Sequence, residues 1–167
     1  MHKMTQQNLQ NAFAGESQAH MKYLIFSDIA EKEGKTNIAR LFRGIAYAEK
    51  VHAANHLKAL GSIGKTPQNL DTAISGENFE VEEMYPVYNN DAKLQNEKEA
   101  EKSTHYALEA EKIHAKMYTH AKSVASQNKD INLKDLYICP LCGYTTEEEV
   151  SDYCPVCGAK KDVFKQF

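Results

Sequence analysis

Four cysteines near the C-terminus form two copies of a CPxCG motif. The first copy is Cys139-Pro140-Leu141-Cys142-Gly143 and the second is Cys154-Pro155-Val156-Cys157-Gly158. In such a turn proline sets φ, and glycine accepts a positive φ directly after the second thiolate. Two of these knuckles that face each other form a tetrahedral sulfur cage, which suits zinc or a single iron ion. The spacing alone leaves both metals open.

A second set of candidate ligands lies on an internal repeat. Ala48-Glu49-Lys50-Val51-His52-Ala53 recurs as Ala110-Glu111-Lys112-Ile113-His114-Ala115, and Ala14-Gly15-Glu16 recurs as Ser75-Gly76-Glu77. Residues i and i+3 lie on one face of a helix, so each Glu-x-x-His pair can direct an oxygen and a nitrogen at one point. The repeat therefore predicts one site for two divalent ions, built from four carboxylates and two imidazoles. Those ligands are Glu16, Glu49, His52, Glu77, Glu111 and His114.

Three further residues complete the predicted site. Glu80 follows Glu77 by one helical turn, whereas the residue 61 positions before it is Ala19, so one metal is offered an additional carboxylate. Our hypothesis is that Glu80 supports the ferric state and His52 the ferrous state. Tyr23 and Tyr85 are candidate donors of hydrogen bonds that orient the ligand carboxylates.

Four long helices are expected to position these ligands. Apolar residues recur at helical spacing, Gly34 and Asn96 are placed to end helices, and Pro86 should bend the third helix. Short connections between long helices predict a four-helix bundle, the fold that carries such carboxylate sites in ferritin-like proteins. The expected helices cover residues 5–30, 36–60, 71–95 and 97–127.

The fold class that follows is an all-α four-helix ferritin-like bundle with a small C-terminal metal-bound β domain. We expect the di-iron bundle at residues 1–130, a polar linker at 131–136 and the tetracysteine domain at 137–167. The net charge of −3 and the charged fraction of 26% show no bias toward polyanions, so nucleic acid is not an expected partner. No apolar run approaches the ~18 residues of a membrane helix, and we expect no membrane partner and a cytoplasmic location.

Over essentially its whole length the chain resembles rubrerythrin. Residues 12–18 resemble the family's first-helix motif, and Gly76-Glu77-Asn78-Phe79-Glu80 with Met84-Tyr85-Pro86 resembles its third-helix motif. The resemblance implies a peroxidase that reduces hydrogen peroxide to water in oxidative-stress defence. It also implies two irons in the bundle, a third iron in a rubredoxin-like domain, and homodimers or larger assemblies in which one subunit's rubredoxin-like domain approaches the other's di-iron site.

The predicted reaction takes two electrons, which a pair of ferrous ions can supply together. Single electrons would then return through the tetrathiolate iron, with a separate rubredoxin or NAD(P)H-dependent reductase as the upstream donor. Two other readings remain open at the level of sequence. One is a ferroxidase that handles iron, and the other is an electron carrier or zinc-ribbon adaptor. Carboxylate and imidazole ligands also accept manganese.

Overall fold

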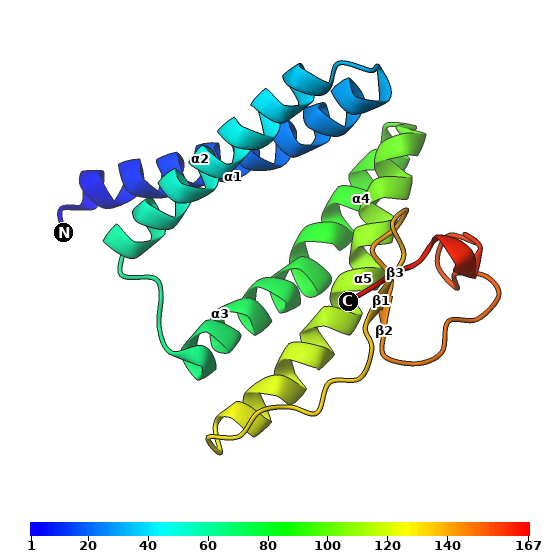
Figure 1. Ribbon diagram of the computed structural model, residues 1–167. Coiled ribbons are helices and arrows are strands. Elements are labelled where there is room, and N and C mark those ends of the chain that lie inside the picture. The colour runs from blue at the N-terminus through cyan, green and yellow to red at the C-terminus, as the bar shows by residue number, and fades with distance from the viewer. The chain divides into compact units, whose positions relative to one another are not determined.

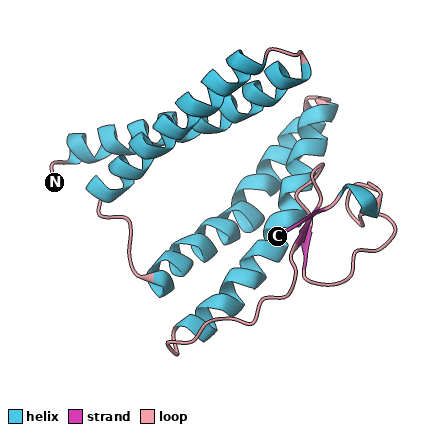
Figure 2. Ribbon diagram, viewed as in Figure 1, coloured by secondary structure: helices cyan, strands magenta, loops and turns pink.

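Five α-helices and one small sheet make up the computed structural model, which describes residues 1–167 (Figures 1 and 2). None of the helices combines the length and the apolar character that a membrane span requires. The chain divides into an N-terminal unit, residues 1–64, and a C-terminal unit, residues 65–167. The elements are α1 (Lys3–Lys32), α2 (Thr36–Ala59), α3 (Thr66–Phe79), the π-helical segment η1 (Glu80–Met84), α4 (Tyr85–Leu94), α5 (Lys98–Ala125), β1 (Tyr137–Ile138), β2 (Thr145–Thr146), the 3₁₀ turn η2 (Lys161–Val163) and β3 (Lys165–Gln166).

The N-terminal unit is a hairpin of α1 and α2 that approach each other through small side chains. Ala39, Ala46 and Ala53 recur every seven residues along α2 and are buried. The Ser27 hydroxyl on α1 donates to the Ala39 carbonyl over 2.9 Å and accepts from Arg43 over 3.0 Å. Because small residues let two backbones approach closely, α1 and α2 lie side by side over most of their length, as Figure 1 shows.

Residues with a positive φ end the long helices. Gly34 has φ +74° and Asn96 has φ +60°, which confirms both predicted helix ends. After α1, the Gly34 N–H donates to the Glu31 carbonyl and the Lys35 N–H to the Ala30 carbonyl. This paired pattern satisfies carbonyls that have no partner inside the helix, and only glycine or asparagine adopts the left-handed conformation at low cost.

The predicted third helix begins earlier than expected and is interrupted. It starts at Thr66 rather than at residue 71, because Pro67 occupies the first turn, where its missing N–H costs nothing. Just before Pro86, where a bend was expected, the helix widens into the π-helical segment, in which the Tyr85 N–H donates to the Glu80 carbonyl. A proline ring clashes with the carbonyl four residues earlier, and the wider turn relieves that clash.

In the C-terminal unit, α3 and α4 pack along α5, and a small sheet follows. Asn89 of α4 is buried and donates to the Glu101 carbonyl over 2.7 Å and to Thr104 Oγ1 over 2.9 Å, which fixes α4 on α5. Residues 129–136 contain no helix or strand, and three antiparallel strands in the order β2-β1-β3 come next. The predicted class, a helical protein with a small C-terminal β domain, is confirmed.

Candidate metal centres

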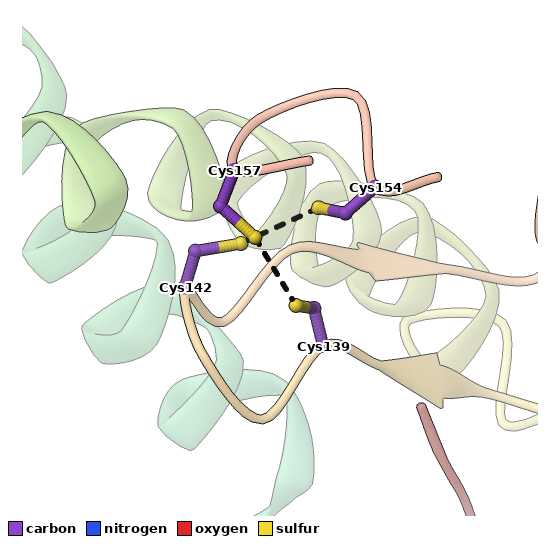
Figure 3. Close-up of side chains that lie close together, drawn as sticks. All are labelled: Cys139, Cys142, Cys154 and Cys157. Carbon is purple, nitrogen blue, oxygen red and sulfur yellow. Dashed lines mark hydrogen bonds between the residues drawn. The ribbon is translucent and has the colours of Figure 1, made fainter. Parts of the chain in front are cut away.

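The four cysteines of the C-terminal unit converge as predicted. Their thiols point toward one another (Figure 3), and the four sulfur atoms all lie within 4.8 Å of one another. Cys139 Sγ lies 3.6 Å from Cys157 Sγ, and Cys142 Sγ lies 3.5 Å from Cys154 Sγ. Metal–sulfur bonds of about 2.3 Å give a tetrahedron with edges of about 3.8 Å. The cage therefore has the dimensions of a tetrathiolate metal site.

The backbone of the two knuckles follows the predicted pattern. Gly143 has φ +79° and Gly158 has φ +74°. In each knuckle the glycine N–H donates over 2.9 Å to the carbonyl of the first cysteine, Cys139 or Cys154. These backbone bonds shape each knuckle locally and direct its two thiols to the same side.

The thiols are not equivalent in their tendency to ionise. Burial raises the pKa of Cys142 far above its ordinary value and raises that of Cys157 as well. Burial also acts on Cys154, but hydrogen bonds from the backbone N–H groups of Cys157 and Val156 outweigh it and lower its pKa. Four thiolates in one buried cage need a compensating positive charge, which a metal ion supplies.

The first half of the predicted bundle site forms a cluster between α1 and α2, the N-terminal cluster. Glu16 comes from α1, and Glu49 and His52 come from α2. His52 Nδ1 lies 2.9 Å from Glu49 Oε2 and 3.6 Å from Glu16 Oε1. The Glu49 side chain is 16% exposed and that of His52 is 53% exposed. Two carboxylates and one imidazole nitrogen converge here, which is a donor set for one divalent ion.

The second half forms an equivalent C-terminal cluster between α3 and α5. Glu77 comes from α3, and Glu111 and His114 come from α5. His114 Nδ1 lies 2.6 Å from Glu111 Oε2, so both histidines present the same ring nitrogen to the carboxylates. Each cluster belongs to one unit, and their union into a single site of six ligands stays a prediction.

The carboxylates of the C-terminal cluster have pKa values raised above their ordinary value. Burial, a hydrogen bond with Glu111 and the charge of Glu111 raise the pKa of Glu77 to about 7, although His114 acts in the opposite direction. Burial also raises the pKa of Glu111 and of Glu80, and the charge of Glu77 adds to the effect on Glu80. A divalent ion would remove this unfavourable crowding of negative charge.

The remaining predicted residues differ in their placement. Glu80 opens the π-helical segment, and its charge acts on Tyr85, whose pKa is raised first by burial and then by Glu80, Glu111 and Glu77. Tyr85 therefore lies close to the C-terminal cluster. Tyr23 packs in an aromatic group on α1 and α2, with ring centroids 6.4 Å from Phe26 and 6.1 Å from Phe42. The roles predicted for Glu80 and the two tyrosines stay predictions.

One contact at the C-terminal cluster escaped the sequence analysis. Thr145 Oγ1 lies 2.9 Å from His114 Nε2, the ring nitrogen that faces away from Glu111. Thr145 is 3% exposed and belongs to β2 of the cysteine domain. The repeat could not reveal it, because Thr145 lies outside the repeated helices. The one feature of the sequence that points to Thr145 is its position two residues after Gly143, the glycine of the first knuckle.

Comparisons with known proteins agree with this arrangement. Residues 7–122 match the family model of rubrerythrin, and residues 137–165 match that of the rubrerythrin rubredoxin-like domain. Rubrerythrin-2 of Clostridium acetobutylicum is 49% identical over 98% of this chain and 97% of its own length. Rubrerythrin of Porphyromonas gingivalis is 32% identical over 96% of this chain and 88% of its own. A solved structure of fully reduced, all-ferrous nigerythrin aligns with a TM-score of 0.57 at 29% identity, covering 98% of this chain and 86% of that one.

Proposed function

The chain belongs to the rubrerythrin family, and from that premise we propose that it is a non-haem di-iron peroxidase that reduces hydrogen peroxide to water. Membership confirms the resemblance seen in the sequence and supports a di-iron protein of oxidative-stress defence. The two carboxylate–histidine clusters and the four-cysteine cage fit iron cofactors. The observation that carries the proposal is the presence of both kinds of site in one chain.

The carboxylate–histidine clusters are the proposed site of the reaction. Iron ions bound there supply the two electrons of the balanced reaction, in which hydrogen peroxide, two electrons and two protons give two molecules of water. The Nδ1 atoms of His52 and His114 and the glutamate oxygens beside them would hold these ions, and the glutamates would balance the positive charge. The clusters are not identical, since Glu80 stands beside the C-terminal one only.

The protons can be held by residues of the C-terminal unit. Glu80 has a raised pKa, because burial and the charge of Glu77 disfavour its ionised form. Tyr85 has a raised pKa for the same kind of reason, so its hydroxyl stays neutral and able to donate a hydrogen bond. We assign to Glu80 the transfer of a proton to the departing oxygen, and to Tyr85 the orientation of the neighbouring carboxylates.

The four-cysteine cage is the proposed entry point for single electrons. Its core packs against Tyr106 of α5, and a Cβ built on Gly143 would lie 3.6 Å from the Ala110 Cβ, next to the ligand Glu111. This contact favours a relay within one chain, whereas the family resemblance implies a relay between subunits. A rubredoxin or NAD(P)H-dependent reductase as donor, a homo-oligomeric state and a cytoplasmic location belong to the same proposal.

The test is an anaerobic reaction of the fully reduced, iron-loaded protein with one equivalent of hydrogen peroxide. We expect about three irons per chain, from a two-iron bundle and a one-iron cage, and a rapid return of the ferric tetrathiolate colour. The Glu49→Ala/Glu111→Ala double variant should keep the cage iron but lose the fast reaction. A cage filled with zinc, or equal rates in the two proteins, would overturn the peroxidase and favour an adaptor or an iron-oxidising protein instead.

A further inference from the structure

The two repeat-related histidines differ in what their second ring nitrogen contacts. His52 and His114 both present Nδ1 to a glutamate of their own helix. Only His114 also has a partner at Nε2, the hydroxyl of Thr145, and its side chain is 30% exposed against 53% for His52. The asymmetry arises because the cysteine domain lies on α5 within the C-terminal unit, where Gly143 approaches Ala110.

The hydrogen bonds around Thr145 have a defined direction. The Thr145 hydroxyl donates to the Gly143 carbonyl over 2.9 Å, so its oxygen is left to accept from His114. A hydroxyl has one proton to give, and it is already used. The Nε2 atom of His114 must therefore carry the proton of this contact. In a neutral ring the lone pair then lies on Nδ1, the nitrogen that faces Glu111.

We propose that Thr145 is a positioning residue that holds His114 with Nε2 protonated and Nδ1 directed at the metal, and that it links this ligand to the cysteine cage of the same chain. Histidines that bind metals usually donate their other N–H to an oxygen, which fixes the ring and raises its basicity as a ligand. Thr145 is such an oxygen, supplied by the cysteine domain.

The link consists of two hydrogen bonds and a short covalent stretch. Cys142 is bonded to Gly143, the Gly143 carbonyl accepts from Thr145, and the Thr145 oxygen accepts from His114. The strand pairing of Thr145 with Ile138 keeps the hydroxyl in place. Met117, Tyr118, Leu136 and Ile138 surround a hollow of about 290 Å³ beside the pair.

A purely structural role for Thr145 explains only part of this geometry. A threonine hydroxyl often bonds to a carbonyl two residues earlier, and the bond to Gly143 is of that kind. Such a turn does not require a buried contact with a histidine of another element. A role in positioning His114 predicts effects on that ring and on its metal, whereas a role in the turn predicts effects on the cysteine cage alone.

The experiment uses the full chain with one equivalent of zinc in the cysteine cage and ¹⁵N-labelled histidine. In the wild-type protein we expect a slowly exchanging Nε2–H signal from His114, and cobalt(II) titration then measures the affinity of the carboxylate–histidine site. Thr145→Val should lose the signal and weaken cobalt binding by roughly 10–100-fold. Thr145→Ser should restore both, because it keeps the hydroxyl.

Thr119→Val is the matched control, since the Thr119 hydroxyl bonds only to the Ala115 carbonyl of its own helix. It should leave the signal and the affinity unchanged. The proposal is overturned if Thr145→Val keeps the wild-type cobalt affinity and ring signal, or if Thr145→Ser fails to restore them.

The link between His114 and the cysteine cage rests on the proposed function. It predicts slower oxidation of the cage iron in iron-loaded Thr145→Val after peroxide is added. A wild-type protein inert toward peroxide would reject the peroxidase, while the cobalt and ring readouts would still decide the role of Thr145.

Discussion

Glu77 of α3 and Glu111 of α5 share a hydrogen bond between their carboxyl groups, which raises the pKa of Glu77 in addition to burial. A shared proton is the means by which two crowded carboxylates avoid being ionised together. The same pair supplies ligands to the C-terminal cluster. The metal-free protein and the metal-loaded protein must therefore differ in their response to pH.

The stability of the metal-free protein should fall as pH rises. The pKa of Glu77 is 4.5 in the unfolded chain and about 7 in the folded one, so between these values the folded state binds more protons. Stability from this group is complete below about pH 4.5 and is lost as pH rises to about 7. Thermal unfolding followed by circular dichroism across this window measures the effect.

Glu77→Gln should flatten that decline, because the amide does not titrate, and iron loading should abolish it. Glu99→Gln, which removes an exposed carboxylate in the first turn of α5, serves as the control and should leave the decline in place. If the metal-free wild type instead became more stable as pH rises over this range, the assignment of a shared proton to Glu77 and Glu111 would be contradicted.

Cys154→Ser should unfold the cysteine domain and leave the helices intact. The domain has strands of only two residues each, and its buried core consists of three cysteines. Small domains of this kind owe their folding to the metal. We expect loss of the tetrathiolate absorption and rapid proteolysis within residues 137–167, with little change in helical circular dichroism. Ser151→Ala in the same domain should retain both the metal and the resistance to protease.

Ala110→Leu should push the cysteine domain away from α5. Ala110 is 3% exposed and lies against Gly143, so a larger side chain meets the knuckle directly. Overpacking of this kind costs about 1–3 kcal/mol. Hydrogen exchange at the amides of β1 and β2 should increase, and the bond between His114 and Thr145 should be lost. Ala48→Leu, the repeat counterpart on α2, should leave exchange in the cysteine domain unchanged.

Two glycine substitutions should have opposite effects on stability. Gly34→Ala forces a side chain into the left-handed conformation at φ +74°, and we expect a loss of about 1–2 kcal/mol. Gly44 lies inside α2 with open space where a Cβ would be, so Gly44→Ala should gain about 0.5–1 kcal/mol. Urea unfolding of the metal-loaded protein gives both values. Equal signs for the two variants would contradict the helix end at Gly34.

Spacing in the sequence was sufficient for the ligands that a single helix or knuckle presents. Glu49 with His52, and Glu111 with His114, meet because residues three apart share a helix face. Helix ends at Gly34 and Asn96 were equally predictable, since few residues adopt a positive φ. These features depend on local geometry alone.

Contacts between elements distant in sequence could not be read from spacing. The bond between Thr145 and His114 depends on how the cysteine domain packs on α5, and no periodicity encodes that packing. The start of α3 was misjudged because proline ends one helix as readily as it begins the next. Pro86 indicated an irregularity, but not whether the turn before it would kink or widen.

The π-helical segment at residues 80–84 joins α3 to α4 and fixes the rotation of α4 side chains about the helix axis relative to those of α3. Such a wide turn is equivalent to one inserted residue, and deleting a residue from it would leave an uninterrupted α-helix. Every later side chain would then rotate through about 100° around the axis. Glu77 would still face α5, but Asn89 would turn away from the Glu101 carbonyl that it now binds. Deleting one residue here should therefore disturb the fold more than most substitutions would. It would leave the ligand Glu77 in place but remove the Asn89 hydrogen bond that fixes α4 on α5.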